Sequence, residues 1–160
     1  MLKPAQGTIL TDNLSSFTPE QSFIARKVVS TSENGKKYLL LFAVPKRCAV
    51  YQVDGNIVTT GDRCDKFILV EEDALVNRWN EIFVELKGRD VGHAIKQLRS
   101  SLQAKVFMHP TIGKRYARIV AQCIPRNSGN SIIERARDEF RKNYSAELKC
   151  WSSGKTDSLS

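Results

Sequence analysis

Two stretches, RCDKFILVEE at residues 63–72 and EIFVELKG at residues 81–88, decide the fold of this chain. Each contains an apolar, partly β-branched run bounded by polar residues, which is typical of a buried strand. Asp65 stands at the start of the first run, and Glu85 and Lys87 close the second. Because side chains alternate along a strand, Glu85 and Lys87 share one face. The pattern predicts two acids and a lysine converging at a sheet edge, where they can hold a divalent cation and place a water beside a phosphodiester.

The same tripeptide occurs a second time, as Glu147-Leu148-Lys149. This copy follows a charged helical stretch, without an apolar strand before it or a partner Asp on a neighbouring strand. The first copy differs because a strand, the upstream Asp65, the following Gly88 and a following helix all occur together. We therefore interpret the second copy as accidental.

The hydrophobic period changes after the first tripeptide. Apolar residues from Val91 to Leu102 fall at i, i+3, i+4, i+7 and i+11, which predicts an amphipathic helix. Asp90 is the expected N-cap of this helix. The apolar run at 115–124 predicts another core strand, ended by Pro125.

Upstream of the motif, the turn-like residues 32–35 favour a hairpin between 22–30 and 37–42. Taken alone, residues 22–30 fit either a helix or a strand. Residues 48–53 predict a further strand, and residues 132–144 predict a second helix.

The order of these elements predicts one α/β domain over residues 1–150, with a central mixed β-sheet flanked by helices. A chain of 160 residues is long enough for one such core. The polar tail at 151–160, rich in Ser and with one Gly, is expected to be disordered.

The net charge of +8 is unevenly distributed. Residues 61–85 carry seven acids and three basic residues, whereas residues 86–119 carry one acid and eight basic residues. An acidic pocket beside a basic belt suits a metal-dependent enzyme that acts on a polyanion. The alternative is the ordinary solvated surface of a basic protein.

The cysteines are widely spaced and form no CxxC or Cys/His cluster, so we expect reduced thiols rather than a zinc site or disulfides. They are Cys48, Cys64, Cys123 and Cys150. The sequence has no apolar run long enough to cross a membrane, and its first residues lack the layout of a signal peptide. The expectation is a cytoplasmic protein without a membrane partner.

The motif residues resemble those of the PD-(D/E)XK nuclease superfamily, which has the restriction-endonuclease-like fold. The matching positions are Asp65, the tripeptide at 85–87 and the helix at 91–98, and the resemblance covers residues 45–125. Cys64 stands where the nominal motif has Pro. The resemblance implies the restriction-endonuclease-like form of the α/β fold.

The resemblance also implies catalytic roles. Asp65 and Glu85 would bind Mg²⁺, for which Mn²⁺ is a possible substitute, with the Leu86 carbonyl as a further ligand. Lys87 would position or activate the attacking water. Gln97 stands on the polar face of the helix, where many members carry Gln or Lys near the metal or substrate. A solvated polar face is the alternative for Gln97.

The implied function is a metal-dependent nuclease that hydrolyses phosphodiester bonds, with DNA as the expected nucleic-acid partner. The alternatives are a non-catalytic nucleic-acid-binding or interaction protein on the same fold, and a nuclease acting on RNA. The sequence also allows a homodimer. Cations after the motif are candidates for phosphate contacts, with ordinary surface charge as the alternative. They are Arg89, Lys96, Arg99, Arg115 and Arg118.

Overall fold

The computed structural model describes residues 7–86, 90–121 and 130–159. Seven strands within these residues form one mixed sheet. The strands are β1 (Gln21–Glu33), β2 (Lys36–Gln52), β3 (Lys66–Asp73), β4 (Arg78–Glu85), β5 (Ile112–Ala121), β6 (Ala146–Ser152) and β7 (Thr156–Asp157). The helices are α1 (Val91–Gln103) and α2 (Asn130–Tyr144), with short helical turns at Leu10–Leu14 and Lys105–Phe107.

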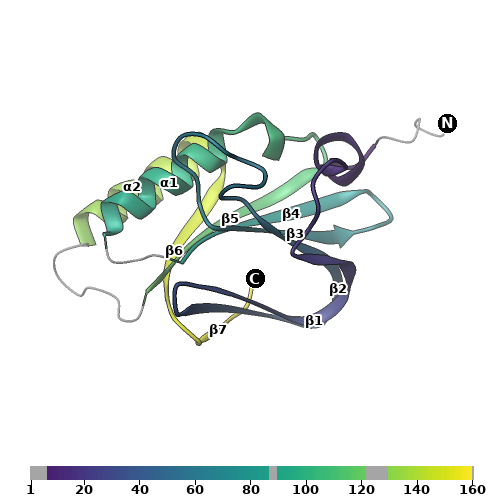
Figure 1. The fold of residues 1–160 in the computed structure, drawn as a ribbon, viewed down its shortest axis with the longest axis horizontal. Helices are drawn as coiled ribbons and strands as arrows, with labels where there is room; N and C mark the ends of the chain where they lie inside the picture. The colour runs from purple at the N-terminus through teal and green to yellow at the C-terminus, as the bar shows by residue number, and fades with distance from the viewer. Residues whose placement is uncertain (1–6, 87–89, 122–129, 160) are drawn as a thin grey trace.

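The sheet runs from β1 to β6 in sequence order, and β7 pairs with β2. Strands β1 to β4 form an antiparallel meander, whereas β4, β5 and β6 are parallel and are connected through α1 and α2. Both helices lie side by side on one face of the sheet (Figure 1). This architecture confirms the predicted α/β domain with a mixed sheet. None of the helices in the described part of the chain is long and apolar enough to cross a membrane.

The long β1–β2 hairpin curls over the sheet face opposite the helices (Figure 1). The second half of β2 pairs with β3 through residues 48–52. The first half pairs with β7 at Leu39 and Leu40. Pro45 lies between these parts and supplies no backbone N–H for a ladder bond, which favours a bend. A register shift in β1, between Arg26 and Val28, falls at the same level.

Strand β3 is buried on both faces. Phe67 and Leu69 contact the core under the helices, whereas Ile68 and Val70 contact the core under the hairpin. Burial on both faces explains why the motif strand is a continuous apolar run rather than an alternating one. On the helix side, the Phe67 and Phe107 rings pack in a tilted arrangement with centroids 4.6 Å apart.

Several sequence predictions are confirmed at the level of elements. The helix begins at Val91, and Asp90 caps it because its Oδ1 accepts a hydrogen bond from the His93 amide at 3.1 Å. Residues 22–30 are part of strand β1, so the helical alternative is wrong for them. The strand expected at 115–124 begins earlier, at Ile112.

The prediction of a disordered tail at 151–160 is wrong for the residues up to 159. Strand β6 runs to Ser152, and β7 then pairs with β2. The carboxylate of Asp157 is buried, where its Oδ2 accepts hydrogen bonds from the Tyr38 hydroxyl at 2.6 Å and from the Arg118 Nε at 2.7 Å. The composition of the tail did not predict that it is ordered, because the residues that it contacts lie far away in the sequence.

Candidate functional site

The structure brings the two predicted acids together. Asp65 directly precedes β3, and Glu85 is the last residue of β4. The antiparallel register between the two strands begins with Lys66 paired to Val84, so Asp65 and Glu85 each adjoin this first pair at the same end of β3 and β4. The Asp65 amide donates to the Val84 carbonyl at 3.2 Å, which ties Asp65 to the end of β4.

Both acids are buried, with exposed fractions of 1 % for Asp65 and 0 % for Glu85. Asp65 Oδ2 accepts a hydrogen bond from the Leu86 amide at 2.7 Å, so the residue after Glu85 fixes the Asp65 carboxylate. The charges of the two acids affect the pKa of the neighbouring Cys64. Burial raises the pKa of the Cys64 thiol to about 12, and the charges of Glu85 and Asp65 contribute to that rise.

Helix α1 is tied to the acid pair through Ser101. The Ser101 hydroxyl accepts a hydrogen bond from the Cys64 amide at 2.9 Å, one residue before Asp65. Gln97 lies one turn earlier on α1 and therefore on the same side of the helix. Its Oε1 is buried, and no hydrogen-bond partner for it exists among the residues that the structure describes. This placement separates Gln97 from an ordinary solvated face.

The curled hairpin adds a carboxylate that the sequence did not reveal. Glu33, the last residue of β1, has its pKa raised by burial and further by the neighbouring carboxylate of Asp65. The Gln52 side chain holds Glu33 in place, donating from Nε2 to Oε1 at 3.1 Å. Glu33 lies in a segment with a strong turn signal, and nothing local to that segment indicates contact with a strand more than thirty residues away.

A buried lysine completes this polar cluster. Lys66 follows Asp65, is 3 % exposed, and its Nζ donates to Gln52 Oε1 at 2.5 Å. The Lys66 ammonium also forms an ion pair with Glu20, whose other oxygen accepts from the Thr31 hydroxyl at 3.0 Å. Lys66 therefore lies beside the acid pair as a charge already held by two partners.

The metal prediction rests on two carboxylates within the described part of the chain. That part contains no group of three or more His, Cys, Asp or Glu side chains arranged to hold a metal ion. Lys87 and Arg89 lie outside the described residues. The predicted ligand Leu86 is buried, and its amide is the atom that contacts Asp65.

Two of the predicted phosphate-binding cations lie on α1. Lys96 is well exposed and approaches Asp62 at 3.5 Å. Arg99 forms a two-pronged ion pair with Glu139 of α2, at 2.6 and 2.8 Å. This contact lowers the pKa of Glu139 and offsets much of the Arg99 charge. Lys96 is therefore the more available of the two cations.

Of the other two predicted phosphate contacts, the one assigned to Arg118 is wrong because its side chain is buried, whereas Arg115 is partly exposed and is held by contacts within the protein. Arg115 Nε pairs with the buried Glu81 at 2.8 Å, and its amino groups donate to the carbonyls of Leu102 and Tyr144. Arg118 has no exposed surface and lies on the opposite side of the sheet. Buried guanidinium groups are retained when hydrogen bonds and an opposite charge satisfy them.

Comparison with known proteins gives no match: no family model, no curated protein and no solved structure is similar to this chain.

Proposed function

We propose that this protein is a metal-dependent nuclease that hydrolyses phosphodiester bonds, with DNA as its expected substrate and a restriction-endonuclease-like form of the mixed sheet. The observation that carries the proposal is that two buried acids, Asp65 just before β3 and Glu85 at the end of β4, lie at the same end of two paired strands. Two like charges buried at one end of a sheet oppose folding unless a cation or a proton offsets them. Such a pair is better explained as a cation-binding site than as a contribution to the stability of the fold.

The carboxylate pair fits a magnesium site. Mg²⁺ binds hard oxygen atoms, commonly through one or two carboxylates, and completes its shell with waters and substrate phosphates. Asp65 and Glu85 provide two such groups, and Mn²⁺ has the same preference. A bound ion would supply Lewis acidity and lower the pKa of a coordinated water.

The protein's own residues have distinct parts in this proposal. Asp65 and Glu85 hold the ion, and the Leu86 carbonyl is the further ligand. Lys87 orients the attacking water and stabilises the charge that develops on the phosphate. The buried Oε1 of Gln97 on α1 has capacity for a hydrogen bond.

The topology supports the restriction-endonuclease-like assignment. The meander of β2, β3 and β4 is followed by α1 and by the parallel strand β5, and the acids stand where β3 begins and β4 ends. Function nevertheless depends on the site, because one fold supports many activities. The experiment must therefore test the acids.

The test is incubation of the full chain with plasmid, linear and branched DNA and with RNA, in Mg²⁺, Mn²⁺ or Ca²⁺. We expect cleavage with Mg²⁺ or Mn²⁺, and Asp65→Asn should abolish it. This variant keeps an oxygen that accepts from the Leu86 amide, so its thermal melt should stay close to that of the wild type. Asp62→Asn, a change three residues upstream in a half-exposed side chain, is the matched control and should cleave normally.

The outcomes separate the alternatives. Cleavage of RNA alone would identify an RNA nuclease. Nucleic-acid binding without cleavage under any of these conditions would identify a non-catalytic binding protein. Cleavage by Asp65→Asn at the wild-type rate would contradict the proposed site.

A further inference from the structure

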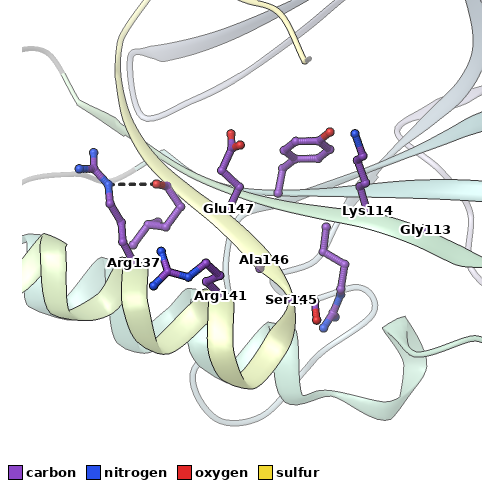
Figure 2. Close-up of a pocket in the computed structure, with 10 residues that line it drawn as sticks. Gly113, Lys114, Arg137, Arg141, Ser145, Ala146 and Glu147 are labelled. Carbon is purple, nitrogen blue, oxygen red and sulfur yellow. Dashed lines mark hydrogen bonds between the residues drawn. The ribbon is translucent and has the colours of Figure 1, made fainter.

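A pocket of about 650 Å³ lies at the other end of the sheet, where β5 and β6 begin beside α2 (Figure 2). Its floor includes Gly113, Arg115 and Ala146, and Arg115 pairs with Ala146 in the sheet. Glu85 pairs with Ile119, four residues further along β5. The pocket is therefore separate from the acid pair and opens near the start of the parallel strands.

Cations from two elements line the pocket. Lys114 comes from β5, and Arg137 and Arg141 stand one turn apart on α2 (Figure 2). Arg137 Nε donates to the Leu148 carbonyl at 3.2 Å, which orients the guanidinium without neutralising it. Within the described residues, Arg137 has no carboxylate partner. Its amino groups are therefore available to an incoming acceptor.

The acid in the pocket lining is already engaged. Glu147 accepts from Arg118 at 3.0 Å and lies 3.5 Å from Lys149. Arg141 pairs with Asp138 at 2.9 Å, but both side chains are well exposed, where such pairs are weak. The Glu81 pair offsets only Arg115. The pocket therefore has an excess of positive charge and favours an anion.

We propose that this pocket binds phosphate groups of the nucleic-acid strand and anchors the substrate away from the reacting bond. The inference rests on the proposed function. Side chains at i and i+4 lie on one helical face, so Arg137 and Arg141 present neighbouring guanidinium groups that suit successive phosphates. A guanidinium binds phosphate through two parallel hydrogen bonds, and cationic tracks of this kind hold a backbone irrespective of sequence.

The position of the pocket defines which substrates reach it. Four residues along the strand and two strands across the sheet correspond to roughly 16 Å from Glu85 at standard sheet spacings. That separation is about five base-pair steps of a duplex. A duplex extending twelve base pairs on each side of the cut should reach the pocket, whereas one extending three base pairs should not.

The experiment compares two double variants of the full chain with equal charge loss. Arg137→Gln with Arg141→Gln removes the pocket cations. Arg135→Gln with Lys142→Gln removes two exposed cations of α2 that lie outside the pocket lining. Duplex binding is measured by fluorescence anisotropy in Ca²⁺ over a range of salt concentrations. Urea unfolding checks that each variant is folded.

We expect the pocket variant to bind the long duplex about tenfold more weakly, with a salt slope reduced by about two, since each phosphate contact releases roughly one counterion. The control should change binding by less than twofold. Arg137→Lys with Arg141→Lys should restore most of the affinity. The short duplex should bind the wild type and the pocket variant equally well.

Equal loss in the two double variants, or no loss in the pocket variant, would overturn the inference. If the wild type cleaves DNA but binding ignores Arg137 and Arg141, the anchor fails while the nuclease proposal stands. If binding depends on these arginines but nothing is cleaved, the nuclease proposal fails while the anchor stands. A wild type that binds a phosphorylated peptide and no nucleic acid would overturn both.

Discussion

The two Glu-x-Lys tripeptides of this chain have identical composition and very different surroundings. Glu85 ends the central strand β4, is buried, and lies at the same end of the paired strands as another buried carboxylate, Asp65. Glu147 lies near the start of β6, at the edge of the sheet, with its side chain 46 % exposed. Its carboxylate contacts Arg118, a residue of opposite charge. A tripeptide therefore acquires chemistry from its position in the sheet and from the charge of its neighbour.

The largest expected effect separates the two glutamates directly. If Glu85 is the metal ligand proposed above, Glu85→Gln should lower the cleavage rate by about 10³-fold or more, because a metal ligand contributes several kcal/mol to transition-state stabilisation. Glu147→Gln should leave the rate within about threefold, since it removes only a partly exposed ion pair worth less than about 1 kcal/mol. The measurement is the single-turnover rate of duplex cleavage in Mg²⁺. Similar losses in both variants would mean that the second tripeptide contributes to the site.

The next largest expected effect tests whether the residues around the second tripeptide stabilise the fold. Asp157→Ala removes the carboxylate shared by Arg118 and Tyr38 and leaves a buried guanidinium with weaker compensation. We expect a loss of about 3 kcal/mol in the free energy of unfolding, measured in urea, because breaking a buried pair leaves a charge behind. The cleavage rate of the folded variant should be unchanged. A stability equal to that of the wild type would show that the tail does not hold the hairpin to the sheet.

The smallest expected effect is on the pH dependence of stability and concerns Glu81, which lies on the same face of β4 as Glu85. Burial raises the pKa of Glu81 to about 7 from an ordinary value of 4.5, although Arg115 opposes the rise. Between these two pH values the folded state binds more protons than the unfolded state, so stability falls as pH rises.

Glu81→Gln should therefore reduce the loss of stability between pH 5 and pH 8 by about 2–2.5 kcal/mol. Urea unfolding at the two pH values measures this difference. Glu134→Gln, at an exposed position of α2, is the control and should retain the wild-type pH dependence. An unaltered slope in Glu81→Gln would assign the pH dependence to other groups.

The elements with strong local signals were predicted correctly. The apolar runs around Asp65 and Glu85 became β3 and β4, and the helix began at Val91 behind its Asp90 cap. Burial on both faces makes a strand apolar throughout, and helical periodicity is a local property, so both patterns can be recognised within about ten residues.

The elements that depend on distant partners were not predicted. Strand β6 lies at the sheet edge and alternates between buried and exposed residues over a short length, and β7 is two residues long. The ordered position of β7 depends on its pairing with β2 and on the Asp157 contacts. The ion pairs of Arg115 with Glu81 and of Arg118 with Asp157 were not predicted for the same reason, because charge along the chain does not indicate which cations lie beside an acid.

The sequence by itself determined the central strands, the crossover helix and the location of Asp65 and Glu85 at the same end of the sheet, because antiparallel neighbours with a buried apolar register have one favourable alignment. Only the tertiary structure decided that Glu33 approaches Asp65, that Arg118 and Asp157 neutralise each other, and that Arg137 and Arg141 line a cationic pocket. These outcomes depend on how the curled hairpin and α2 pack on the sheet. Packing sets the distance between charges that the sequence separates by tens of residues, and that distance governs their interaction energy.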